Sequence, residues 1–156
     1  MEKKYTITCD EKHLRLIAKA LEQHSRIICG QLGESYMPAL EHGMMKEHYY
    51  KYKENHPEDA DNAMSNYCAV RENVENNLAV IKQLVWKQSP NASYGIGYDK
   101  EADYGYETYK TILSFFEDEK MKQCEIDGTK YSGNVHTGEP LKLTDNPRME
   151  IKILEE

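Results

Sequence analysis

The stretch EDADNAMSNYCAVRENVENNLAVIKQLVWKQS, residues 58–89, decides most of the fold. It contains neither glycine nor proline, and its apolar residues recur every three or four positions, which is the period of an amphipathic α-helix. Acidic residues gather near its start, and Lys82 and Lys87 stand near its end, as the helix dipole favours. The sequence therefore predicts one long helix between Pro57 and Pro90. Its expected buried stripe consists of Met64, Tyr67, Val70, Val74, Leu78, Ile81 and Val85.

Two shorter helices are predicted before the long one and one after it. Asp10 can accept the free backbone N–H groups of a first turn, so a helix is expected from there to about Cys29, where Gly30 can end it. Pro38 suits the first turn of a second helix, which extends to about Asn55, and the residues between Gly30 and Pro38 are expected to form a connection. The helix after the long one is expected to bury Tyr106, Tyr109, Ile112, Leu113 and Phe116.

Apolar and polar residues alternate at both ends of the chain, which predicts β-strands. Residues 3–9 show this alternation, and residues 141–144 and 149–153 show it on either side of a turn at 145–148, which is the pattern of a β-hairpin. The N-terminal strand would complete the sheet. The expected fold class is therefore α+β, with about four helices packed on a small, mostly antiparallel sheet in a single domain that spans residues 1–156.

The composition argues against several classes of protein. The chain has 27 acidic and 20 basic residues, a net charge of −7, and duplex nucleic acid is bound mainly by cations, so nucleic acid is not an expected partner. No apolar run is long enough for a membrane span or a signal peptide, so we expect a cytoplasmic protein that does not bind membranes. The four cysteines show no CxxC spacing, so we expect no metal and no cofactor.

Known catalytic patterns are missing from the sequence. It contains no HExxH and no GxSxG, and its one GxG, at residues 95–97, lies between two predicted helices rather than after a strand. An enzyme is therefore not the favoured interpretation. The 12 tyrosines, against 2 phenylalanines and 1 tryptophan, favour a protein with contact surfaces, because tyrosine is enriched in interfaces.

The loop at residues 89–97 is the most distinctive segment, because it carries three polar side chains next to flexible glycines. One hypothesis is a small-ligand-binding protein or enzyme with a pocket around this loop. Its candidate binding residues are Arg26, Gln31, Asn91, Ser93 and Tyr94. The other interpretation, which we favour, is that these groups satisfy helix ends and that the tyrosine ring fills the core.

A third and weaker hypothesis is single-stranded nucleic-acid binding. Lysines and tyrosines alternate between residues 46 and 53, and aromatic rings beside cations can stack on bases while the cations contact phosphates. The residues concerned are Lys46, Tyr49, Tyr50, Lys51, Tyr52 and Lys53. A solvated helix face with amphipathic tyrosines gives the same pattern and is the favoured interpretation.

Two short motifs resemble a group of small bacteriophage and prophage proteins. One is Ser25-Arg26-Ile27 followed by Gly30-Gln31-Leu32, and the other is the NASYGI loop at residues 91–96 before a tyrosine-rich helix. The group has no established activity, so the resemblance implies a mobile-element setting and no catalytic residue. The leading expectation is therefore a non-enzymatic accessory or protein-interaction protein of a phage-derived element, with a host or phage protein as partner. We also consider a homodimer, because the edges of a thin sheet need protection.

Overall fold

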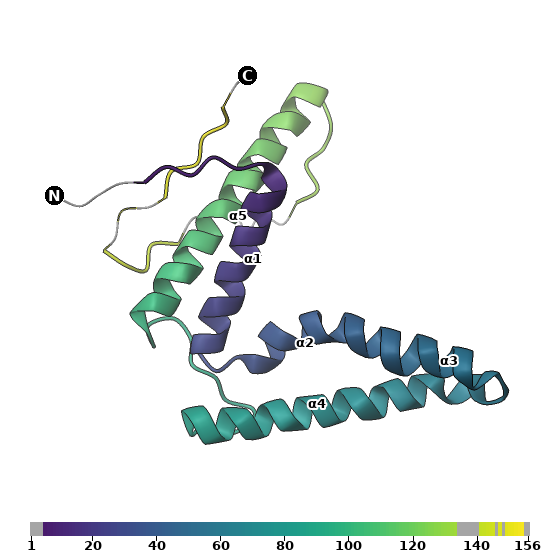
Figure 1. Ribbon diagram of the computed structural model, residues 1–156. Helices are drawn as coiled ribbons and strands as arrows, with labels where there is room; N and C mark the ends of the chain where they lie inside the picture. The colour runs from purple at the N-terminus through teal and green to yellow at the C-terminus, as the bar shows by residue number, and fades with distance from the viewer. Residues whose placement is uncertain (1–4, 134–140, 146, 148, 155–156) are drawn as a thin grey trace. The chain divides into compact units, whose positions relative to one another are not determined.

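The computed structural model describes residues 5–133, 141–145, 147 and 149–154 (Figure 1). The chain divides into two compact units. Unit 1 comprises Met1–Ser25 and Ile96–Glu156, and unit 2 comprises Arg26–Gly95.

The predicted α+β fold is wrong, because no β-strand occurs in the described residues and the fold is all-α. The predicted hairpin segments, as far as they are described, have no regular structure, and the backbone N–H groups of Leu143 and Thr144 bind the carboxylate of Glu107 instead of a neighbouring strand. The side chains of Tyr5 and Ile7, in the predicted N-terminal strand, are 83% and 79% exposed. Residues 3, 4, 146 and 148 of the predicted strands and turn lie outside the described part of the chain.

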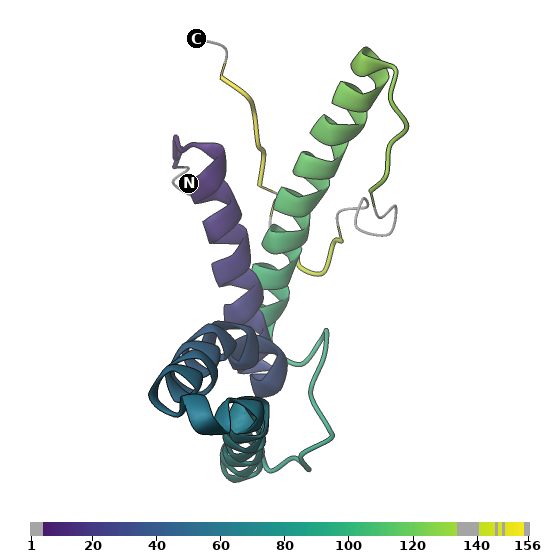
Figure 2. The same cartoon turned by 90° about the vertical axis from the view of Figure 1, so that its right-hand side faces the viewer.

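Unit 1 is built on two antiparallel helices, α1 (Glu11–Ile28, whose last turn from Arg26 belongs to unit 2) and α5 (Lys100–Asp127), which lie side by side in Figures 1 and 2. The predicted cap of α1 is confirmed, because Asp10 Oδ1 accepts the backbone N–H of His13 at 2.8 Å. The helices approach closely where α5 has a glycine: a Cβ on Gly105 would stand 2.6 Å from Ser25 Oγ. Ala18 of α1 and Ala102 and Ile112 of α5 are buried.

Unit 2 contains the long helix α4 (Ala63–Trp86), and a helical stretch that runs beside it (Figure 1). This stretch consists of α2 (Leu32–Met44), the π-helical segment η1 (Met45–Tyr50) and α3 (Lys51–Asn55), and the 3₁₀ turn η2 (Pro57–Asn62) connects it to α4. Two side-chain bonds join the stretch to α4, from Tyr67 Oη to Glu41 at 2.9 Å and from Asn66 Nδ2 to the carbonyl of His48 at 2.8 Å.

The second helix does not begin where the sequence predicts. It starts at Leu32, whose side chain is buried, and Pro38 lies inside it rather than in its first turn. A proline inside a helix removes one backbone hydrogen bond and lowers helix stability by about 3 kcal/mol. A helix that starts at Pro38 avoids this cost, which is the reason for the predicted start. The predicted connection between Gly30 and Pro38 is therefore wrong, and the burial of Leu32 indicates that packing outweighs this cost.

The long helix is confirmed, but its apolar stripe is only partly covered. Tyr67 is buried and Val70, Val74 and Leu78 are half-buried. The prediction fails at both ends of the helix, because Met64 at its start and Ile81 and Val85 near its end are exposed. The helix ends at Trp86, and Lys87 takes a left-handed conformation with φ +57°.

Candidate functional site

Three of the five candidate ligand-binding residues meet in unit 2. Arg26 Nη1 donates to Gln31 Oε1 at 2.9 Å, and Gln31 Nε2 donates to the carbonyl of Tyr94 at 2.9 Å. The amide of Gln31 is thus engaged at both ends and joins the last turn of α1 to the loop that follows α4. A glutamine held in this way positions backbone rather than waiting for a ligand.

The two motifs of the phage-like resemblance touch each other at this point. The backbone N–H of Tyr94 donates to the carbonyl of Cys29 at 3.1 Å, and the indole N–H of Trp86 donates to the carbonyl of Ile28 at 2.8 Å. The last carbonyl groups of a helix lack partners within the helix. The backbone of the loop and the Trp86 indole supply them here, and not the side chains of Asn91 and Ser93 that the sequence favoured for this role.

Gly30 permits this contact. Its φ is +70°, which glycine adopts without strain, and a Cβ at this position would lie 3.1 Å from Gln88 Oε1 and 3.3 Å from the Trp86 ring. A side chain would therefore have both the wrong backbone conformation and too little space.

Asn91 and Ser93 do not join this cluster through any described hydrogen bond, and both side chains are exposed. Asn91 lies in a turn in which the N–H of Ala92 donates to the carbonyl of Ser89 at 3.1 Å, and Ser93 follows this turn. The carbonyl of Pro90 accepts Lys82 Nζ at 3.2 Å. The five candidates thus divide into three that lie together and two with exposed side chains.

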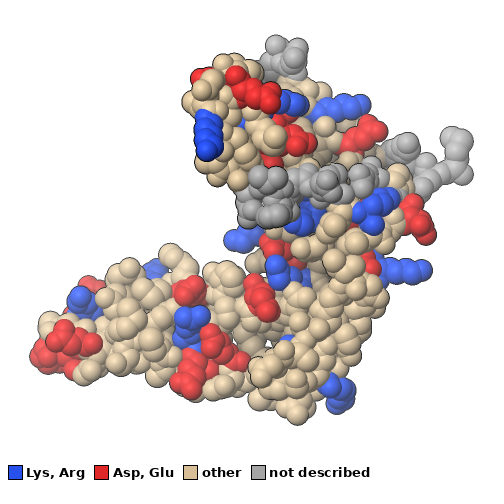
Figure 3. Space-filling view, turned by 180° about the vertical axis from the view of Figure 1, so that it is seen from behind, with Lys and Arg blue, Asp and Glu red and all other residues tan. Residues whose placement is uncertain are grey.

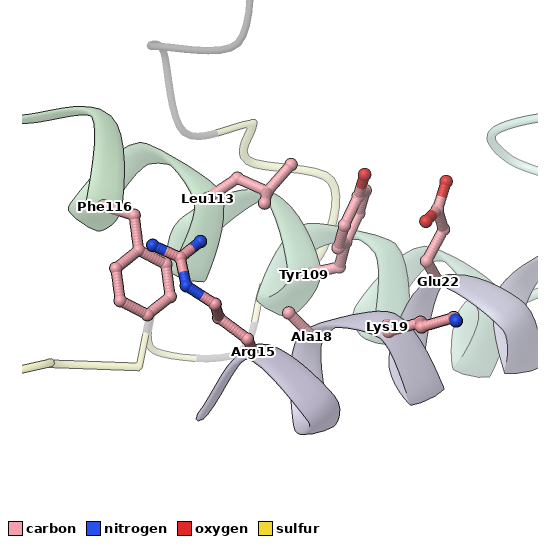
Figure 4. Close-up of a pocket in the computed structure, with 7 residues that line it drawn as sticks. All are labelled: Arg15, Ala18, Lys19, Glu22, Tyr109, Leu113 and Phe116. Carbon is pink, nitrogen blue, oxygen red and sulfur yellow. The ribbon is translucent and has the colours of Figure 1, made fainter. Parts of the chain in front are cut away.

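Unit 1 contains a cavity that the sequence did not predict. It lies between α1 and α5, has a volume of about 230 Å³, and opens to solvent (Figure 4). Its lining residues are Arg15, Ala18, Lys19, Glu22, Tyr109, Leu113 and Phe116. The Arg15 guanidinium lies 3.9 Å from the centre of the Phe116 ring and is paired with Glu11 at 2.7 Å, so one of the two cations that line the cavity is already neutralised.

Glu107 is a buried carboxylate in α5 that sequence reasoning missed. Only 2% of the residue is exposed, and it accepts hydrogen bonds from Lys142 Nζ at 2.9 Å and from the N–H groups of Leu143 and Thr144 at 2.8 Å each. The Thr144 hydroxyl adds a fourth bond at 3.1 Å. Burial by itself raises the pKa of this carboxyl, but the four bonds together lower it from 4.5 to about 2. Glu107 therefore stays ionised and holds the C-terminal segment on α5.

The second feature that the sequence missed is on the outside of α4. Four apolar side chains project into solvent over the last two turns of the helix, and we call this set the α4 apolar face. Its members are Val80, Ile81, Leu84 and Val85, with exposed fractions of 54%, 46%, 65% and 62%. Lys82, the only charged residue between Asn76 and Trp86, points the other way and is 8% exposed.

The segment proposed for single-stranded nucleic acid forms η1 and the start of α3, and part of its charge is neutralised. Lys51 Nζ pairs with Glu47 at 2.5 Å, and the Tyr52 hydroxyl donates to Asp59 at 2.6 Å. Figure 3 shows acidic and basic side chains intermingled on the visible face of the molecule rather than a continuous basic area. This arrangement does not favour phosphate binding.

Among the described residues, no group of three or more His, Cys, Asp or Glu side chains is placed to hold a metal ion. Within the same ranges, no helix combines the length and apolar character that a membrane span requires. Comparison of the chain with protein-family models, with curated proteins and with solved structures returned no match.

Proposed function

We propose that this chain is a non-enzymatic accessory protein of a phage-derived element that acts by binding another protein chain through the α4 apolar face. The observation that carries the proposal is the reversed polarity at the end of α4, where Lys82 is buried while Leu84 and Val85 are exposed. The phage-derived setting rests on the resemblance of the SRI and NASYGI segments to phage and prophage proteins.

Burying a lysine costs free energy, because the ammonium loses water and gains one carbonyl acceptor, that of Pro90. Each of the four apolar side chains is about half exposed, so each lacks about 1–2 kcal/mol of the hydrophobic stabilisation that full burial would give. A helix that only had to fold in water would place the lysine outside and the leucine inside. The opposite arrangement is consistent with a surface that a protein partner covers.

The α4 apolar face also has the character of a specific interface. Its residues are contiguous on one helix, and the neighbouring side chains Asn76 and Asn77 are polar but uncharged. Contiguous apolar patches with a polar rim mark protein-binding sites, whereas apolar residues scattered singly do not. Leu16 in α1 is as exposed as Leu84, at 64% against 65%, and serves as a matched control.

The experiment is photo-crosslinking in cells that express the full chain. A photoreactive amino acid is placed at position 84, and at position 16 in a control chain. We expect position 84, and not position 16, to form an adduct with a protein that mass spectrometry identifies and that binds when both chains are purified. The adduct should disappear when Val80→Lys is added. Equal adducts from both positions, or none from position 84, would refute the proposal.

A further inference from the structure

The α4 apolar face contains no exposed charge. From Asn76 to Trp86 the only ionisable residue is Lys82, which is buried, although 30% of the whole chain is charged. Such a neutral stretch of three turns matters for self-association. In a two-fold contact only the residues near the axis meet their own copies, so an exposed charge there would lie near a like charge and weaken the contact.

The size of the face also indicates the kind of contact. An apolar patch of this type covers on the order of 300–600 Å². Two copies together would bury less than the roughly 1,600 Å² of a standard interface, which places the contact among the weak and concentration-dependent ones.

We propose that a second copy of this chain covers the α4 apolar face, in a two-fold contact of α4 with α4 near Ile81 and Leu84. This inference rests on the proposed function, because it names a partner for the same surface. The argument for a homodimer from unprotected sheet edges no longer applies, since the described residues contain no sheet. The neutral helix face replaces it.

The test is sedimentation velocity of the purified full chain over a wide range of concentrations. We expect a monomer–dimer equilibrium, and we expect Leu84→Lys to weaken the dimer by at least about tenfold, because two lysines then meet at a buried contact. Leu16→Lys, at a position of the same exposure, should leave the equilibrium unchanged. Far-ultraviolet circular dichroism confirms that each variant is folded.

A charge-swap mixture separates a contact between copies from a general loss of solubility or fold. Leu84→Lys and Leu84→Glu should each self-associate weakly, and their mixture should form dimers more tightly than either variant alone. A wild-type chain that stays monomeric at every concentration, a dimer that is insensitive to Leu84→Lys, or a mixture no tighter than its components would overturn the second-copy proposal. In the first case an adduct from position 84 in cells would still support the proposed function, so the two failures are distinguishable.

Discussion

Glu107 accepts both the backbone N–H and the hydroxyl of Thr144, at 2.8 and 3.1 Å, although the two residues are 37 positions apart. One carboxylate in the N-terminal third of α5 thereby binds a segment that has no secondary structure of its own. Lys142 and Leu143 donate to the same group, so three consecutive residues of this segment bond to one side chain.

Replacing that carboxylate should therefore destabilise unit 1. We expect Glu107→Gln to lower the free energy of unfolding by about 2–4 kcal/mol, because an amide cannot accept four bonds and leaves Lys142 without its buried partner. Urea unfolding followed by circular dichroism measures this change. Glu150→Gln is the control. The Glu150 side chain is 81% exposed and lies 3.4 Å from Lys152 Nζ, so the loss of this exposed ion pair should lower the free energy of unfolding by less than about 0.5 kcal/mol. Equal effects of the two substitutions would contradict the role of Glu107.

The same carboxylate predicts the response to acid. The pKa of Glu107 is lowered from 4.5 to about 2 in the folded chain, so its contribution to stability is complete above pH 4.5 and is lost as the pH falls toward 2. The difference corresponds to roughly 3 kcal/mol. Unfolding free energies measured between pH 7 and pH 2 should fall more steeply in the wild type than in Glu107→Gln. Parallel curves would mean that the carboxyl titrates normally.

Gly30 offers a test of the cluster in unit 2. Gly30→Ala should destabilise this unit by more than about 1 kcal/mol, because the new Cβ meets Gln88 and Trp86 at a backbone φ of +70°. Trp86 is the only tryptophan of the chain, so its fluorescence reports the unfolding of unit 2. Gly43→Ala is the matched control, because Gly43 is helical with no atom near its Cβ, and it should stabilise by up to about 1 kcal/mol. If Gly30→Ala leaves the free energy of unfolding unchanged, the packing of Gly30 against Gln88 and Trp86 is loose.

Periodicity was enough to predict the helices, because an amphipathic pattern and a capping residue act locally. Asp10 caps α1, Gly30 follows its end, and α4 occupies most of the stretch between Pro57 and Pro90. The start of α2 could not be predicted in the same way. Local rules place Pro38 in a first turn, and only the burial of Leu32 shows why the helix begins earlier.

The strands failed for a different reason. Alternation shows that a segment can bury one side when extended, but a strand also needs another backbone to bond to. The backbone N–H groups of Leu143 and Thr144 find Glu107 instead, and a carboxylate 36 or 37 residues away leaves no local signal in the sequence. The candidate site shows the same limit. The loop and the end of α1 lie together in the structure, but the sequence could not show that Gln31 bonds to both Arg26 and Tyr94.

Lys82 provides the last prediction, because the proposed function depends on whether this lysine is buried or exposed at the end of α4. If the lysine were on the outside, Lys82→Asp would leave stability nearly unchanged. In the structure it is 8% exposed and its ammonium has the Pro90 carbonyl as acceptor, so methionine would remove a desolvation cost while keeping the shape. We therefore expect Lys82→Met to leave the unfolding free energy unchanged or to raise it by about 1 kcal/mol, whereas Lys82→Asp should lower it by more than about 3 kcal/mol. Trp86 fluorescence during urea unfolding measures both variants. A Lys82→Asp variant as stable as the wild type would place the lysine in solvent and would remove the reversed polarity on which the α4 apolar face depends.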